Sequence, residues 1–146
     1  MRIGIASDHR GYKLKEYLKN ILVNAHEVID YGTNSEESTD YPDYAFALGE
    51  AVVKKEVDYG VAICGSGIGI SIACNKVKGI RCAKVSNKEE AAITRIDNNS
   101  NIVAFSEKLT EQEALEVVTT FITTEASSEE KHQRRVNKII AYEENN

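Results

Sequence analysis

The chain has 146 residues, enough for one domain with a hydrophobic core, and we expect residues 1–146 to form a single domain. Hydrophobic residues make up 42% and charged residues 28%, an ordinary globular composition. A net charge of −5 argues against nonspecific binding to nucleic acid. No apolar run approaches the roughly 20 residues of a membrane span, and charged residues come too early for a signal peptide. We therefore expect neither a nucleic-acid nor a membrane partner.

Cysteine usage indicates the compartment. Cys64, Cys74 and Cys82 are odd in number and form no C-x-x-C motif. This pattern fits neither a disulfide framework nor a zinc site. A reducing cytoplasm is the expected location.

In chain order, the first half predicts three strands and two helices. Residues 2–7 form a short apolar run, and residues 11–24 have helical spacing with Leu14 and Leu18 on one face. Residues 28–31 predict a second strand, and residues 34–40 a polar loop. Pro42 stands where a helix can begin, and an apolar helical stripe follows as far as Val53. Residues 57–64 predict the third strand.

The second half continues the alternation. Residues 68–76 predict a helix, 80–85 a strand, 87–96 a helix and 102–105 the fifth strand. Thr110 and Glu113 have the spacing of a capping box that opens a helix through residue 122. A last helix is expected over residues 128–143. Repeated strand–helix alternation predicts a three-layer α/β sandwich, with a five-stranded parallel sheet, right-handed crossovers and an extra C-terminal helix.

A glycine-rich loop follows the third strand, in the sequence Cys64-Gly-Ser-Gly-Ile-Gly69. A dinucleotide fingerprint requires glycine where Ile70 stands, and an acidic residue about 20 positions further on, where none is found. A Walker loop requires Gly-Lys-Ser/Thr at its end, and a cysteine phosphatase loop requires arginine in place of Ile70. Two interpretations remain open: an oxyanion or phosphate cradle at a helix start, or a tight turn without a ligand.

Two polar segments are expected at the carboxyl edge of the sheet, where α/β proteins bind ligands. Cys64 ends the third strand, and amides at the start of a helix favour the thiolate form of such a cysteine. That thiolate can act as a nucleophile or a base. Asp8 and His9 follow the first strand, where they suit a sugar hydroxyl and a phosphate. Cys74 and Cys82 are expected to be packing residues.

The last predicted helix carries a basic cluster. Lys131 and Arg135 are four residues apart, as are Arg134 and Lys138, so the pairs lie on neighbouring helical stripes. The cluster is either a solvated helix face or an anchor for a small anion.

Taken together, these segments resemble the sugar-phosphate isomerase family that contains ribose-5-phosphate isomerase B and galactose-6-phosphate isomerase. The resemblance covers almost the whole chain. Its motifs are Ser7-Asp8-His9-Arg10-Gly11, Thr39-Asp40-Tyr41-Pro42, Ile63-Cys64-Gly65-Ser66-Gly67-Ile68-Gly69, Asn75-Lys76-Val77-x-Gly79-Ile80-Arg81 and Lys131-His132-x-x-Arg135.

The resemblance implies a Rossmann-like fold, no cofactor or metal, and a homodimer or homotetramer. The implied reaction interconverts ribose 5-phosphate and ribulose 5-phosphate, in the pentose phosphate pathway, through a cis-enediolate. Cys64 would move the proton, and Ser66 with the amides of Gly65, Gly67, Ile68 and Gly69 would stabilise the enediolate oxygen. The implied substrate-binding residues are Asp8, His9, Asp40, Tyr41, Asn98, Lys108, Lys131 and Arg135. Of these, the resemblance assigns Lys108, Lys131 and Arg135 to the phosphate.

The sequence also departs from the family pattern. The family commonly has a ring-opening histidine where Asp97 stands, so either Asp97 takes that role or ring opening is uncatalysed. Lys108 and Lys131 stand at positions that are commonly arginine, and lysine lacks bidentate geometry. A hexose-6-phosphate isomerase acting on galactose or allose phosphates, and a non-catalytic sugar-phosphate-binding protein, remain alternatives.

The expected positions also predict a shared site. Asp97 and Asn98 are expected after a helix and before the fifth strand, at the edge opposite Cys64. A strand of five or six residues spans roughly 17–20 Å, too far for one side chain to bridge. A two-fold homodimer would bring Asn98 of one subunit to Cys64 of the other.

Overall fold

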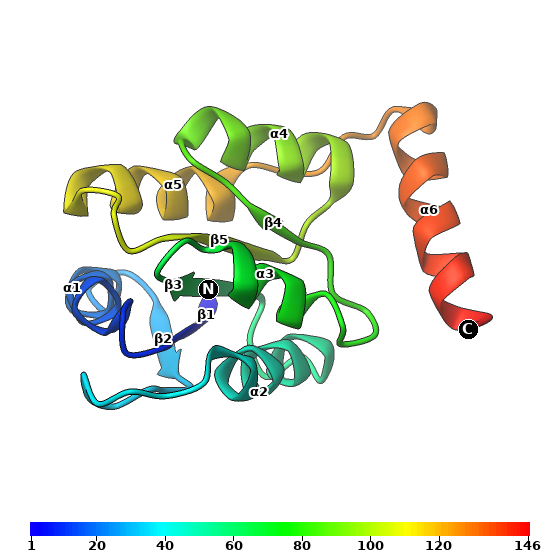
Figure 1. The fold of residues 1–146 in the computed structure, drawn as a ribbon. Helices are drawn as coiled ribbons and strands as arrows, with labels where there is room; N and C mark the ends of the chain where they lie inside the picture. Colours follow the sequence, from blue (N-terminus) through cyan, green and yellow to red (C-terminus); the bar gives the residue numbers. More distant parts are fainter.

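Five parallel strands form the sheet that organises the fold (Figure 1). The computed structural model describes residues 1–146. The strands are β1 (Arg2–Ser7), β2 (Glu27–Asp30), β3 (Tyr59–Cys64), β4 (Cys82–Lys84) and β5 (Ile102–Ser106), in the spatial order β2-β1-β3-β5-β4. The chain moves outward from β1 to β2, and then returns to place β3 on the other side of β1. The carboxyl ends of β1 and β3 therefore open the crevice in which such sheets bind ligands.

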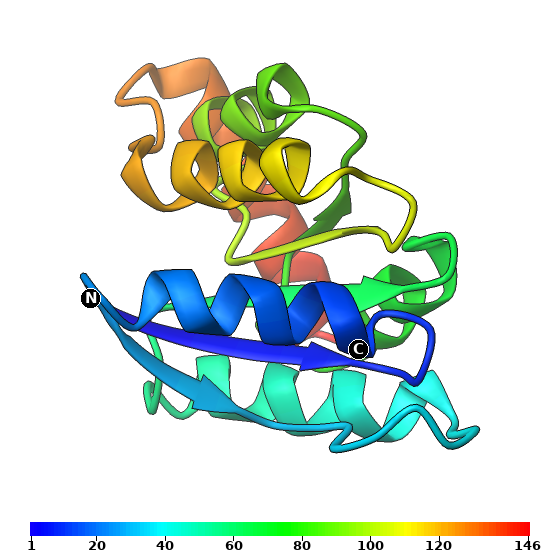
Figure 2. The same ribbon diagram turned by 90° about the vertical axis from the view of Figure 1, so that its left-hand side faces the viewer.

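Helices cover both faces of the sheet, as predicted. The face packed on Ile3, Ile5 and Phe105 is covered by α1 (Tyr12–Leu22), α4 (Lys88–Asn98) and α5 (Glu111–Thr123). The opposite face carries α2 (Tyr41–Val53) and α3 (Ile68–Cys74). Figure 2 shows α1 and α2 on opposite sides of β1. The apolar residues of the strands are thus buried on both faces, as a parallel sheet requires.

The last helix, α6 (Glu130–Glu144), stands apart from the sandwich (Figure 1). Val136 is its one buried residue, whereas Tyr142 is 74% exposed. Near its start, the Ser127 amide donates to the Ile96 carbonyl of α4 at 3.0 Å, and near its end Glu143 accepts from the Gly79 amide at 2.6 Å. The helix is therefore fixed at its two ends and leaves an apolar side exposed. None of the helices is both long enough and apolar enough to cross a bilayer.

Most predicted boundaries agree with the structure within two residues. Pro42 lies in the first turn of α2, and the Thr110–Glu113 capping box is present at the start of α5. The fourth strand is shorter than predicted, and the Asn75 side chain pairs with the backbone N–H and C=O of Cys82, its first residue. Helix α4 is longer than predicted. Asp97 and Asn98, expected beyond this helix, form its last turn.

Candidate active site

Cys64 lies at the carboxyl end of β3, inside the crevice between β1 and β3. Its side chain is buried, with the residue only 4% exposed. The Gly67 amide donates a hydrogen bond to the Cys64 Sγ at 3.2 Å. The glycine loop thus folds back on the cysteine that precedes it and holds its sulfur in place with a backbone donor.

Two glycines of this loop are required by close packing. Gly67 has φ +79°, and a Cβ there would lie 2.5 Å from the Phe105 carbonyl carbon. A Cβ on Gly69 would lie 2.7 Å from the Tyr41 ring. The loop can therefore approach β5 on one side and the start of α2 on the other only without side chains.

The backbone amides of the loop divide into two groups. Gly67 donates to Cys64, and the Ile68 amide donates to the Ser66 Oγ at 3.1 Å. The amides of Gly65, Ser66 and Gly69 donate no hydrogen bond within the chain. Ser106 Oγ fixes the loop by donating to the Gly65 carbonyl at 2.7 Å. These three amides, with Gly65 and Ser66 nearest to Cys64 in sequence, are therefore the ones that can stabilise an oxyanion.

Asp8, His9, Asp40 and Tyr41 lie together in a cavity of about 410 Å³. Asp8 Oδ1 accepts from the amides of Arg10 and Gly11, at 2.9 and 3.1 Å, so this carboxylate also shapes the turn after β1. His9 Nδ1 accepts from the Thr39 amide at 3.1 Å. An Nδ1 that accepts leaves the proton of a neutral imidazole on Nε2, so His9 can present a donor to a ligand.

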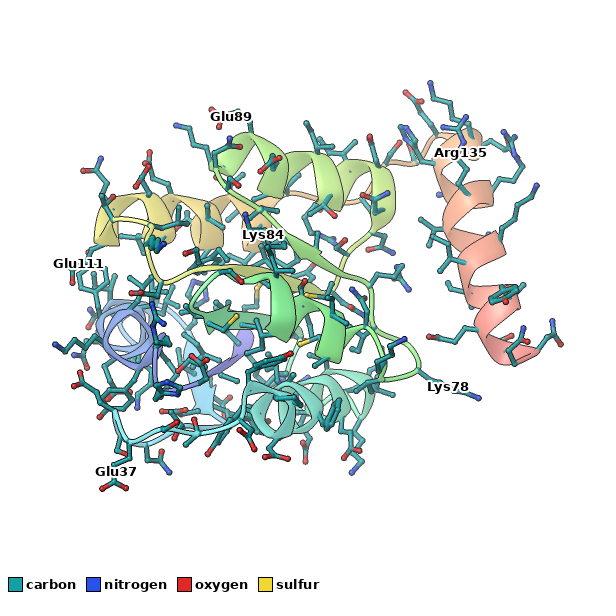
Figure 3. The ribbon with its side chains drawn as sticks, in the orientation of Figure 1. Glu37, Lys78, Lys84, Glu89, Glu111 and Arg135 are labelled. Carbon is teal, nitrogen blue, oxygen red and sulfur yellow. The ribbon has the colours of Figure 1, made fainter.

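A basic cavity of about 480 Å³ adjoins the glycine loop. Gly65, Ser66 and Ile68 line it together with three cations, Arg10, Lys84 and Lys108, and with Ser106. The sequence interpretation assigned Lys108 to the phosphate but gave no such role to Arg10 or Lys84. Lys84 comes from β4 and Arg10 from the turn after β1, so only the fold brings them together. Figure 3 shows Lys84 over the sheet beside α3.

The remaining predicted residues form a second group around the end of α4 and the start of α6. Asp97 lines a cavity of about 310 Å³ between these helices. Asn98 is exposed next to it and accepts from Thr94 Oγ1 at 3.2 Å. Lys131 and Arg135 are exposed on α6, where Figure 3 shows Arg135 far from Lys84. Within one chain, the predicted residues therefore occupy two separate regions.

Comparison with known proteins decides the family of the chain. The sequence profile of the family described as "Ribose/Galactose Isomerase" matches residues 3–139. The chain belongs to the ribose/galactose isomerase family.

Individual members of the ribose/galactose isomerase family match over almost their full length. The putative sugar phosphate isomerase YwlF of Bacillus subtilis is 44% identical, over 100% of this chain and 99% of the relative. Ribose-5-phosphate isomerase B of Escherichia coli is 39% identical, over 98% of this chain and 97% of the relative.

Solved structures of family members agree with the fold. Clostridium thermocellum ribose-5-phosphate isomerase B superposes with a TM-score of 0.95 at 44% identity, covering 99% of both chains. The Mycoplasma genitalium ribose-5-phosphate isomerase B was solved with bound ribulose-5-phosphate. It superposes with a TM-score of 0.92 at 37% identity, covering 99% of this chain and 97% of that one. The resemblance inferred from the motifs, and the Rossmann-like three-layer fold that it implied, are confirmed.

This ribose/galactose isomerase family member also has two arginines near the end of α4, beside the second group of predicted residues. The sequence interpretation gave neither arginine a role. Arg95 is buried against the rings of Tyr59 and Phe121 and donates to the Ser100 carbonyl at 2.6 Å. Arg81 donates through Nε to the Asn98 carbonyl at 3.1 Å. Burial lowers the pKa of Arg81, and the nearby Arg95 charge adds to this effect.

Arg81 holds the Asn98 carbonyl at the end of α4, and Arg95 holds the Ser100 carbonyl just beyond it. Together they fix the turn next to Asp97 and Asn98. Arginine is suited to this task because its planar fork donates several hydrogen bonds and stacks on aromatic rings. No local motif marks either residue, since their partners lie on other elements.

Proposed function

We propose that the chain interconverts ribose 5-phosphate and ribulose 5-phosphate by moving a proton between C2 and C1, with Cys64 as the base. The observation that carries the proposal is the Gly67 amide on the Cys64 Sγ, at the carboxyl edge of the sheet and beside a basic cavity. Membership of the ribose/galactose isomerase family supports it. The relative from Mycoplasma genitalium was solved with bound ribulose-5-phosphate, which supports the same substrate for this chain.

The proposed reaction begins with the open-chain aldose. The Cys64 thiolate removes the C2 proton, the C2 electrons form the C1–C2 double bond, and the carbonyl oxygen at C1 takes the negative charge. The free amides of Gly65 and Ser66 stabilise that charge. Cys64 then returns the proton to C1, while the hydroxyl proton of O2 passes to O1. The product is the ketose, and the thiolate is regenerated.

The proposed substrate contacts follow from the two adjoining cavities. Asp8, His9, Asp40 and Tyr41 face the sugar hydroxyls on one side of the glycine loop. The basic cavity on the other side, with Lys108, Arg10 and Lys84, suits the phosphate. Asn98, Lys131 and Arg135 are proposed to complete the site from a second subunit.

A shared site is supported by the separation of the two groups of residues and by the exposed apolar side chains. Each subunit acts as one domain, and we infer that two subunits form at least a homodimer in the cytoplasm. The large apolar side chains exposed on the helices that carry the site include Ile68 and Ile72 of α3, Ile93 and Ile96 of α4, and Ile139 and Tyr142 of α6. Burial of this apolar surface in an isologous interface would stabilise the dimer.

Replacement of the proposed base tests the reaction. Cys64→Ser is expected to keep the fold and to lose about 10²–10⁴-fold of the isomerisation rate, the usual contribution of a positioned base. Deuterium uptake at C2 of ribose 5-phosphate in D2O reports the proton transfer itself. Cys82→Ser, the same chemical change outside the cavities, is the matched control. A Cys64→Ser enzyme that isomerises near the parental rate would show that the base lies elsewhere.

The same assay separates the alternatives. Turnover of galactose 6-phosphate or allose 6-phosphate above that of ribose 5-phosphate would assign the chain to hexose phosphates. Tight binding of a sugar phosphate without deuterium uptake would make it a binding protein.

The shared site is tested by mixing two inactive variants, Cys64→Ala and Asn98→Ala, under conditions of subunit exchange. A heterodimer carries one doubly damaged site and one intact site, so activity is expected to return toward half of the parental value. Absence of recovery, with heterodimers demonstrated by mass spectrometry, would mean that one chain supplies both residues to the same site.

A further inference from the structure

We propose that Asp30, held by the buried Lys15, positions the Asp8 carboxylate and thereby sets the affinity of the site for the sugar. This inference rests on the proposed function, in which Asp8 faces the sugar hydroxyls. Neither Asp30 nor Lys15 lines the two cavities of the site, so both are positioning residues that act through other groups.

The charged part of this arrangement lies between α1 and the end of β2. Lys15 is fully buried, which is rare for lysine unless it is paired. Its Nζ donates to Asp30 Oδ2 at 2.6 Å and to Glu16 Oε2 at 3.0 Å. Lys19 donates to the same two carboxylate oxygens, at 2.8 and 3.2 Å. These contacts occupy Asp30 Oδ2 and leave Oδ1 for a backbone partner.

Asp30 Oδ1 carries the connection toward the site. It accepts from the Gly32 amide at 2.8 Å. The Gly32 carbonyl accepts from the Ser7 amide, and the Thr33 amide donates to the Ser7 carbonyl, both at 2.8 Å. Ser7 is the fully buried last residue of β1 and directly precedes Asp8. The segment after β2 thus holds both backbone groups of the residue that places Asp8.

Asp8 connects this path back to α1. Its Oδ1 accepts from the Arg10 and Gly11 amides, and the Gly11 carbonyl accepts from the Lys15 amide at 2.9 Å. Figure 2 shows this turn from β1 into α1 at the carboxyl end of the strand. The closed path consists, in order, of Lys15, Asp30, Gly32, Ser7, Asp8 and Gly11. Asp8 Oδ1 belongs to this path, whereas Oδ2 makes no hydrogen bond within the chain and is available to a sugar hydroxyl.

The role of Asp30 depends on its having two acceptor oxygens. An asparagine has one, so it can keep the contact with Lys15 or the contact with Gly32 and must turn an N–H group toward the other donor. Release of Gly32 frees Ser7 and shifts Asp8, although the change lies outside the cavity. Displacement of a binding group by about 1 Å is enough to lose roughly 10²-fold in rate.

The experiment compares Asp30→Asn with the parental enzyme, with the fold of each checked by circular dichroism. We expect KM for ribose 5-phosphate and the Kd of the linear analogue 5-phosphoribonate to rise about 10-fold, the loss of one charge-assisted hydrogen bond, with kcat within about threefold. The Kd of inorganic phosphate is expected to stay within about twofold, because the basic cavity lies on the other side of the glycine loop.

Glu16→Gln is the matched control. It removes a carboxylate from the same two lysines but has no contact with Gly32, so all of these values are expected to stay within about twofold of the parental ones. A purely structural role for the charged cluster would give Glu16→Gln and Asp30→Asn similar losses, and would weaken inorganic phosphate together with 5-phosphoribonate.

Lys15→Met is the second variant, and it decides by the same values if Asp30→Asn does not fold. It removes the buried donor to Asp30 while methionine fills most of the volume, so a weaker Kd for 5-phosphoribonate is expected. The double variant is expected to bind no more weakly than the weaker single variant, because the two residues act as one unit.

A folded Asp30→Asn protein with the parental Kd for 5-phosphoribonate would overturn the proposal. So would an equal loss in Glu16→Gln, or an equal weakening of inorganic phosphate. A parental enzyme that binds 5-phosphoribonate but isomerises neither sugar would instead refute the proposed function, and the Kd values would still decide the positioning role.

Discussion

Gly67 connects the stability of the glycine loop to the chemistry of Cys64, and Gly67→Ala separates the two contributions. The backbone at this position has φ +79°, a left-handed conformation that costs a residue with a Cβ about 1–2 kcal/mol. The added methyl would also lie 2.5 Å from the Phe105 carbonyl carbon and 2.8 Å from its Cα. Backbone in β5 cannot move aside like a flexible side chain, and overpacking of this kind costs about 1–3 kcal/mol.

The free energy of unfolding of Gly67→Ala is therefore expected to fall by about 2–5 kcal/mol, a large share of the roughly 5–15 kcal/mol typical of a domain. Urea denaturation followed by circular dichroism measures the change. Gly65→Ala is the matched control for stability. A Cβ there meets nothing closer than Arg10 Cγ at 3.7 Å, an ordinary contact, so its effect is expected to stay below about 1 kcal/mol.

The chemical consequence follows from the same shift of the backbone. A displaced Gly67 amide no longer donates to the Cys64 Sγ at 3.2 Å, so the sulfur loses the contact that fixes its position. Misplacement of a reacting group by about 1 Å can cost roughly 10²-fold in rate. Deuterium uptake at C2 of ribose 5-phosphate, measured without urea, reports this loss. A Gly67→Ala protein as stable as the parent, or one that exchanges the C2 proton at the parental rate, would refute this reasoning.

Three further predictions concern the frame around the site. Asp30→Asn removes the carboxylate 2.6 Å from the fully buried Lys15 and leaves Glu16, at 3.0 Å, as the remaining counter-charge. Loss of this charged hydrogen bond is expected to cost about 1.5–3 kcal/mol in urea denaturation at pH 7. Burial by itself raises the pKa of Asp30, but hydrogen bonds from Lys15 and Lys19 and from the Gly32 amide outweigh it and hold the pKa below its usual value. The parental protein should therefore keep this stabilisation above about pH 4 and lose it as acid protonates Asp30, whereas Asp30→Asn should lack that acid-dependent loss. Arg95→Lys keeps the charge but loses the forked hydrogen bonds, so a loss of about 2–4 kcal/mol in thermal unfolding is expected. Thr110→Ala removes the cap of α5 and is expected to cost about 0.5–2 kcal/mol in urea denaturation.

Each of these predictions has a contradicting result. If the stability of Asp30→Asn falls in acid as much as that of the parent, other carboxylates cause this loss. An Arg95→Lys protein of parental stability would mean that water replaces the lost donors. A Thr110→Ala protein without measurable loss would show that the packing of α5 alone sets its start.

Local signals were sufficient for the elements and for the parallel sheet. The alternation of apolar runs and helical stripes predicted five strands and six helices, because each pattern reflects the face that an element buries. Pro42 and the Thr110–Glu113 capping box predicted helix starts, since their effects act within one turn. The motif around Cys64 pointed to the crevice at the carboxyl edge, because a strand–loop–helix order alone places that loop there.

Contacts between distant segments required the tertiary structure. The strand order β2-β1-β3-β5-β4 and the pairing of the Asn75 side chain with the edge of β4 depend on which elements meet in space. The same holds for the basic cavity that joins Arg10 to Lys84 and for the arginines that hold the end of α4. His132 and Asp97 are 35 positions apart, and their 3.5 Å contact exists only because α6 returns to α4. Sequence periodicity records which face of an element is buried, whereas only the packed fold determines which side chain lies opposite.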